Sequence, residues 1–372
     1  MLLMVANPRT SCHLVDFVND LKKTGLYVMG HVHVGTMDDS CDDPDPAQLE
    51  HPNWLGLIDF LRVKAFVELT VSDSVRDGMR HLVRLSGLGG MKPNTVCLGF
   101  YDSSTREDLL ADYHAAASSW NPLLKLRQDN ASLEDSGTSE ICANFPDPKE
   151  LPAVKQFDGA EYVGMVCDAL RMKQNVCLFR HFAQFNKRAL FSRGEPASID
   201  VWPVDFFASS STSVTEFDTT CLFLLQLSCI LHMVPGWKRH TSLRIFACVP
   251  RGTSFEEAQL KKRRLNEYLS DLRIRGQVHV VAWEHVESPR PSRSDSPNLA
   301  DVALPADDHV RRINGVIREQ CSGTAVVFLY LPRPPSDFTQ HGEYLRCLEL
   351  VTDDLPPTVL VHGLHPVTST TL

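Results

Sequence analysis

Residues 82–100, LVRLSGLGGMKPNTVCLGF, predict the end of a helix, a glycine-rich turn and a strand in direct succession. Gly87 stands where a left-handed residue ends a helix, Leu88 is expected to pack back onto that helix, and Pro93 prevents the helix from resuming. The apolar run 95–98 predicts a strand covered on both faces. The preceding residues predict one buried helical face at helical spacing, formed by Val75, Met79, Leu82 and Val83.

The glycines at 87, 89 and 90 resemble a phosphate-binding loop in composition but not in orientation. A dinucleotide-binding loop follows a strand and opens a helix, so that the free N–H groups of the helix start face the phosphate. Here the glycines follow a helix and lead into a strand, at the negative end of the helix dipole. We therefore interpret this stretch as a structural turn.

Strands and helices alternate along most of the chain, which predicts an α/β fold: two consecutive subdomains with mainly parallel sheets flanked by helices. The first subdomain is expected at residues 1–100 and the second at 158–372. Residues 101–157 lose the periodicity and predict a flexible linker, and a disordered insertion is expected at about 284–305. The expected strands are 2–6, 26–34, 65–69, 95–99, 175–180, 198–202, 242–249, 277–283, 325–331 and 358–362.

Composition restricts the classes of function. The 372 residues carry a formal net charge of −9, which argues against a nucleic-acid binder. The eleven cysteines form no C-x-x-C pair and lie mostly in apolar runs, which favours buried free thiols in a reducing compartment. The longest apolar run, 221–234, is shorter than the roughly 20 residues of a membrane span and predicts a core helix of a soluble polypeptide. No catalytic motif is present, so we do not expect an enzyme.

Residues 87–95, GLGGMKPNT, resemble a signature of the cytosolic C-terminal domain of the cation-chloride cotransporters, solute carrier family 12. The likeness continues through 25–32 (GLYVMGHV), 63–67 (VKAFV), 199–203 (IDVWP), 243–246 (LRIF), 328–335 (FLYLPRPP) and 366–368 (PVT). It implies a regulatory and dimerisation domain at the cytosolic face of a plasma or endolysosomal membrane. The parent would be a multi-pass protein for chloride-coupled cation transport, such as potassium symport, or for modulation of other cotransporters. Its membrane-spanning transport unit is absent from this chain, which we expect to be a fragment or a truncated product.

The resemblance also implies partners and an alternative function. The implied partners are a second copy of the chain, the transport unit of its own parent and other cation-chloride cotransporters. The fold resembles that of universal stress proteins, and one branch of the family is thought to hold an adenine nucleotide in this half. The alternative is therefore a nucleotide-binding sensor domain, with ATP as cofactor and Asn7, Arg9 and Ser11 as candidate contacts at the first strand-to-helix turn.

Four further groups of residues are candidates for sites. His31 and His33 alternate on a strand but lack further ligands nearby, and the acidic loop 38–45 lacks the pattern of a calcium site, so no metal is expected. The basic cluster 261–264 predicts either a solvated helix face or contact with an anionic membrane surface. The stretch 288–297 provides candidate phosphorylation sites at Ser288, Ser292, Ser294 and Ser296.

Overall fold

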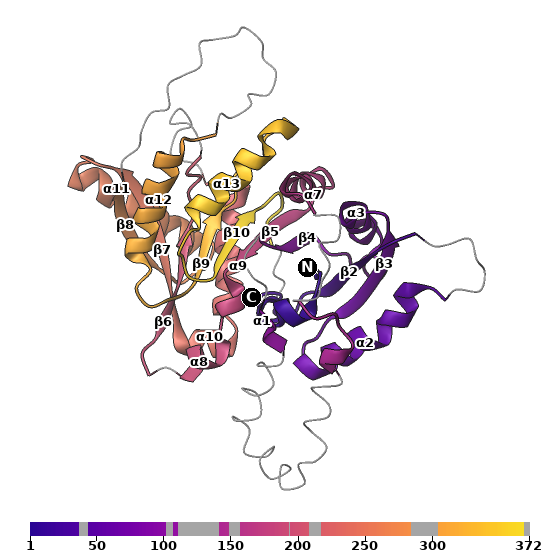
Figure 1. Cartoon of the computed structure of the whole chain (residues 1–372). Helices are drawn as coiled ribbons and strands as arrows, with labels where there is room; N and C mark the ends of the chain where they lie inside the picture. The colour runs from indigo at the N-terminus through magenta and orange to yellow at the C-terminus, as the bar shows by residue number, and fades with distance from the viewer. Residues whose placement is uncertain are drawn as a thin grey trace. The chain divides into compact units, whose positions relative to one another are not determined.

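The computed structural model describes residues 1–36, 44–101, 107–110, 141–148, 157–192, 194–207, 217–283 and 304–367 (Figure 1). They fall into two compact units, which we describe separately. The first comprises Met1–Asp158 with Phe182–Phe185, and the second comprises Gly159–His181 with Asn186–Leu372. The mainly parallel α/β class is confirmed. The exact boundaries, the flexible linker and the likeness to universal stress proteins stay predictions, because most of the linker lies outside the described residues.

The first unit is a four-stranded parallel sheet in the order β3-β2-β1-β4. Strands β1, β2 and β3 each lead into a helix that returns the chain to the same end of the sheet, as parallel pairing requires. Its elements are β1 (Leu2–Met4), α1 (Pro8–Leu21), β2 (Val28–Val34), α2 (Pro46–Leu61), β3 (Phe66–Ser72), α3 (Val75–Leu85) and β4 (Thr95–Gly99). A short 3-10 helix, Phe182–Gln184, completes the unit, with the Phe182 ring 4.6 Å from that of Phe17 in α1.

Helices α2 and α3 cover opposite faces of this sheet. Gly78 of α3 lies so close to Val32 of β2 that a Cβ there would meet its side chain at 2.4 Å. The neighbouring His31 instead packs on Trp54 of α2, with ring centroids 4.8 Å apart. Successive strand residues face opposite sides, so the two helices lie on opposite faces.

The glycine stretch has the expected structural role. Helix α3 ends at Leu85, Gly87 follows with φ +118°, and β4 is buried apart from its last residue. A Cβ on Gly87 would lie 2.4 Å from the Met91 carbonyl oxygen, so only glycine fits. The prediction for Leu88 was wrong: its side chain is 61% exposed, and its backbone exchanges two hydrogen bonds with Met91 across a tight turn.

The second unit is a six-stranded sheet in the order β5-β10-β9-β6-β7-β8, in which only the β5–β10 pair is antiparallel. Its strands are β5 (Asn175–Arg180), β6 (Ala197–Trp202), β7 (Thr241–Pro250), β8 (Gln277–Trp283), β9 (Thr324–Tyr330) and β10 (Thr358–His362). Its helices are α7 (Gly159–Arg171), α8 (Lys187–Ser192), α9 (Thr219–His232), α10 (Pro235–His240), α11 (Phe255–Asp271), α12 (Asp307–Gln320) and α13 (His341–Val351), with a 3-10 turn at Phe338–Gln340.

Helix α9 is the buried helix that the apolar run predicted. It packs against four strands of the sheet, and Leu224, Leu225 and Leu231 are fully buried. Helices α12 and α13 lie side by side (Figure 1), joined by Asn314, which donates to the carbonyl groups of Val351 and Asp353. The sheet of this unit is thus flanked by helices along most of its width.

A buried ion pair connects three strands of the second unit. The Asp200 side chain is fully buried and accepts from Arg244 Nε at 2.7 Å and from Arg244 Nη2 at 2.6 Å. Thr324 Oγ1 donates to the same carboxylate at 2.6 Å, and Arg244 also donates to the Gln320 carbonyl at the end of α12. Asp200 and Arg244 belong to the IDVWP and LRIF motifs, so those motifs contain two halves of one contact.

We expect Asp200→Ala to lower the free energy of unfolding of the second unit by about 3–5 kcal/mol, because it leaves Arg244 without its counter-ion in a largely buried position. Urea unfolding followed by tryptophan fluorescence measures the loss. The matched control is Asp354→Ala, whose exposed pair with Arg318 should contribute no more than about 1 kcal/mol. Equal effects of the two variants would contradict the importance of the buried pair.

Candidate functional site

The N-terminus of α1 is the first place where an open α/β sheet offers a ligand site. Asn7 caps the helix by accepting from the Arg9 N–H at 2.9 Å, and Ser11 Oγ donates to the Asn7 carbonyl at 2.8 Å. The Asn7 amide nitrogen also donates to the Pro146 carbonyl at 2.9 Å. The three predicted contacts therefore share one turn, and their polar groups are already hydrogen-bonded within the chain.

Arg9 is held by the chain's own acceptors. Its Nε donates to Asp108 Oδ2 at 3.0 Å, Nη2 binds the same carboxylate, and Asp147 lies 3.5 Å away. Nη1 donates to the carbonyls of Cys142 and Phe145 at 3.3 and 3.2 Å. The hydrogen bond with Asp108 raises the pKa of Arg9, and the side chain is only 13% exposed. The positive charge of Arg9 is thus balanced by carboxylates of the first unit itself.

Residues 141–148, which we call the covering segment, lie over this strand-to-helix turn. The segment provides carbonyl acceptors to Asn7 and Arg9, and its Phe145 ring packs edge-on against Trp54 at 5.4 Å. Ligands of open α/β sheets bind beyond the carboxyl ends of the strands. In this unit the chain itself contacts the groups that would bind a ligand there. ATP binding by Asn7, Arg9 and Ser11 stays the alternative hypothesis.

Sequence reasoning missed the partners of this turn. Asp108 is 99 residues from Arg9, and Asp147 is 138 residues away, both in the stretch interpreted as a linker. Neither has a local motif that sets it apart from the other acidic residues of that stretch. The nearest signal is Phe145, a large apolar residue in polar surroundings, which is 6% exposed.

Arg9→Ala is expected to lower the free energy of unfolding of the first unit by about 2–3 kcal/mol, because Asp108 and two carbonyl groups lose their charged donor. We expect millimolar ATP to leave the melting temperature of the unaltered chain unchanged, since Arg9 already has a counter-ion. Differential scanning fluorimetry tests both, with Arg80→Ala, which removes an exposed pair with Asp77, as the control. An ATP-dependent rise that Arg9→Ala abolishes would instead support the nucleotide site.

Two histidines of β2 lie near this turn, and one of them, His31, packs on Trp54, which also contacts Phe145. His31 Nδ1 lies 2.8 Å from the Val5 carbonyl and its Nε2 lies 3.7 Å from Glu50 Oε2, while His33 Nδ1 lies 2.9 Å from Glu50 Oε1. Burial lowers the pKa of His31, and the Val5 carbonyl and Glu50 oppose that shift. Within the described part of the chain no group of three or more His, Cys, Asp or Glu side chains has the geometry to hold a metal ion.

Because the folded-state pKa of His31 is lowered, the unfolded chain takes up its proton first as the pH falls through about 6.5. The contribution of neutral His31 to stability is therefore present at about pH 7.5 and is lost toward about pH 5.5. We expect His31→Gln to reduce the fall in melting temperature over this interval. The control is His81→Gln, an exposed histidine of α3. An unchanged pH dependence in His31→Gln would contradict this assignment.

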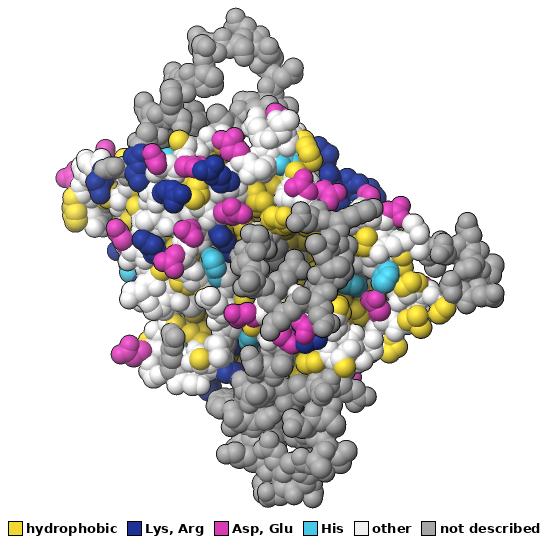
Figure 2. Space-filling view, viewed as in Figure 1, with side chains coloured by type: hydrophobic (Ala, Val, Ile, Leu, Met, Phe, Trp, Pro, Cys, Tyr) yellow, Lys and Arg dark blue, Asp and Glu magenta, His cyan; other side chains and the backbone are white. Residues whose placement is uncertain are grey.

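The other candidate residues are distributed as follows. In the basic cluster, Lys261 turns inward and donates to the Cys248 carbonyl at 2.5 Å, while Arg263 and Arg264 are exposed. Figure 2 shows Lys and Arg side chains interspersed with Asp and Glu over α11 and α12. The four candidate phosphorylation serines and most of the insertion 284–305 lie outside the described residues.

The cysteines of the described residues are all free thiols. Burial raises the pKa of Cys12 to about 12, and it does the same for Cys248 and Cys321. The thiolate is the nucleophilic form of cysteine, so these thiols are poor nucleophiles near neutral pH.

The chain is similar to the solute carrier family 12 proteins, and residues 11–116 match the family model described as "Solute carrier family 12". The chain is 41% identical over 379 residues to "Solute carrier family 12 member 9" of Danio rerio, covering 100% of this chain and 40% of that protein. The protein of the same name from Homo sapiens is 38% identical over 401 residues, covering 100% and 42%. These matches confirm the resemblance that the motifs indicated.

The similarity extends to a protein named as a cotransporter. "Vacuolar cation-chloride cotransporter 1" of Saccharomyces cerevisiae is 32% identical over 299 residues, covering 76% of this chain and 25% of that protein. The chain thus spans about 40% of the length of the member 9 relatives. Among the described residues no helix is both long and apolar enough to cross a membrane.

Proposed function

We propose that this chain is a cytosolic regulatory and dimerisation domain of a cation-chloride cotransporter-like membrane protein. The observation that carries the proposal is the full-length similarity of the chain to about 40% of each member 9 protein. The match therefore leaves more than half of each relative for a membrane-spanning transport unit. Two compact α/β units without a metal cluster or a catalytic motif among the described residues suit an interaction role better than an enzymatic one.

The domain would act on transport by binding one state of the transport unit more tightly than another. A partner or a modification shifts such an equilibrium only by the difference in its affinity for the two states. The proposed partners are a second copy, the parent transport unit, other cation-chloride cotransporters and, through Arg263 and Arg264, an anionic membrane surface. Phosphorylation at Ser288, Ser292, Ser294 or Ser296 would add negative charge to the chain.

Replacing the matching segment of the zebrafish member 9 protein with this chain tests the proposal. In cells that produce the chimaera, we expect delivery to the membrane and chloride-dependent rubidium uptake at the level of the unaltered protein, because the two segments share 41% identity. Deleting the segment should change the uptake or the dimer content. The control is a chimaera carrying Asp200→Ala, in which the fold of one unit is weakened. Uptake and assembly that do not respond to deletion would refute a regulatory role.

A further inference from the structure

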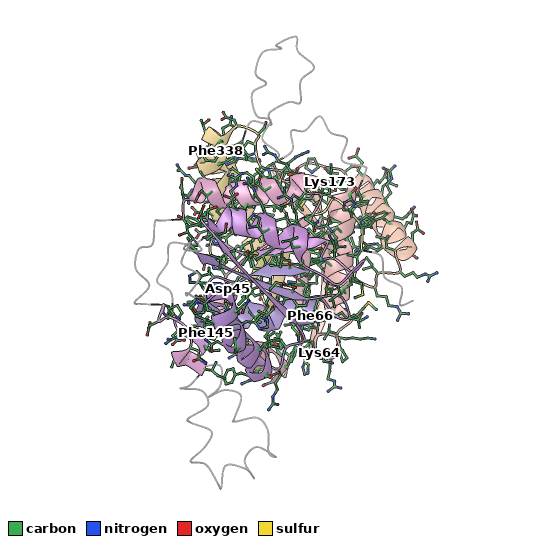
Figure 3. The ribbon with its side chains drawn as sticks, turned by 90° about the vertical axis from the view of Figure 1, so that its right-hand side faces the viewer. Asp45, Lys64, Phe66, Phe145, Lys173 and Phe338 are labelled. Atoms are coloured by element: carbon green, nitrogen blue, oxygen red, sulfur yellow. The ribbon has the colours of Figure 1, made fainter. Side chains whose placement is uncertain are left out.

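Strand β3 forms an open edge of the first unit. It is the last strand in the order β3-β2-β1-β4, and among the described residues β2 is the one strand paired with it in this unit. Natural sheets usually protect such edges with prolines, bulges or several charged residues. The sequence FVELTVS of β3 contains no proline and a single charged residue, Glu68. Figure 3 views the molecule from this side.

The backbone groups that point away from β2 can be assigned. The Phe66 N–H donates to the Tyr27 carbonyl at 2.9 Å, and the Ser72 carbonyl accepts from the Gly35 N–H at 3.0 Å. Backbone groups alternate along a strand, so the even-numbered residues face β2. The N–H and C=O groups of Val67, Leu69 and Val71 therefore point outward, available for another strand.

The side chains at the two ends of β3 differ in charge. Lys64 precedes the strand and Asp73 follows it, and both are exposed. Lys22 Nζ donates to the Lys64 carbonyl at 2.7 Å, which adds a second positive charge at that end. Phe66, beside Lys64 in Figure 3, is 52% exposed. The edge thus has positive side chains at its start and a negative side chain at its end. The three residues whose backbone groups point outward, Val67, Leu69 and Val71, are apolar.

We propose that β3 pairs antiparallel with β3 of a second copy of this chain, about a two-fold axis at Leu69. Leu69 then lies opposite Leu69 of the other copy, and Val67 lies opposite its Val71. In this register Val67, Leu69 and Val71 of one copy lie opposite residues of the other copy whose backbone N–H and C=O groups also point outward. Each directly opposed pair therefore exchanges two hydrogen bonds. This inference rests on the dimerisation part of the proposed function and assigns the surface.

A second copy fits this edge because the edge is complementary to itself. In the Leu69-centred register Glu68 lies opposite Thr70 of the other copy, whereas a shift that centres the axis on Glu68 would oppose two carboxylates. Lys64 of each copy comes next to Asp73 of the other, at both ends of the paired strands. An unrelated strand could match the hydrogen-bond phase, but it would match the charge order only by coincidence.

Charge reversal at the ends tests the pairing. We expect the unaltered chain to be a dimer by size-exclusion chromatography with light scattering. Lys64→Asp or Asp73→Lys alone should raise the dimer dissociation constant about tenfold. Each variant gives positions 64 and 73 the same charge, so two like charges meet at both ends of the paired strands. The double variant Lys64→Asp/Asp73→Lys should restore the dimer. Amide hydrogen exchange should slow at Val67, Leu69 and Val71 as the chain concentration rises, while Glu68 and Thr70 stay protected throughout.

Two outcomes would overturn the assignment of the edge. A dimer that neither single reversal weakens, or that the double variant fails to restore, would place the interface elsewhere and leave the proposed dimerisation intact. A chain that stays monomeric at about 100 μM would refute both the pairing and the dimerisation of this domain. Melting temperatures of the variants, expected within a few degrees of the unaltered chain, show that folding is preserved.

Discussion

A carboxylate that is fully shielded from water must have its charge balanced, and this requirement governs the second unit. Asp200 meets it with a two-pronged contact from Arg244 on the neighbouring strand and a hydroxyl from Thr324 on the strand at its other side. Strands β6, β7 and β9 must therefore lie next to each other in one register. The strong cost of an unpaired buried charge makes alternative orders of these strands unfavourable.

Much of the fold was predictable because apolar periodicity is a local signal. The strands at 175–180, 277–283 and 358–362 were predicted with the bounds that the structure has. The short helices α8 and α10 were missed, since six residues hold too few apolar positions to define a face. The prediction for Leu88 was wrong because residues after a helix-ending glycine often pack back onto that helix. Here the adjacent glycines allow a tight turn closed by Leu88 and Met91, and the Leu88 side chain points to solvent.

The candidate site was less predictable than the fold. Asn7 and Ser11 could be assigned to a helix start from their types alone. The partners of Arg9 could not, because Asp108 and the covering segment come from a part of the chain without periodicity. An arginine at a helix N-terminus therefore has two interpretations from sequence, an anion site or an internal ion pair. Only the three-dimensional arrangement of distant residues distinguishes them.

The turn between α3 and β4 has a practical consequence. Gly87 is fixed by its close approach to Met91, but the tip at Gly89 and Gly90 has nothing within 4 Å of an added Cβ. Tips of this kind accept inserted sequence without disturbing the flanking elements. A small fluorescent or epitope reporter placed between Gly89 and Gly90 would therefore label the first unit, leaving both chain ends unmodified.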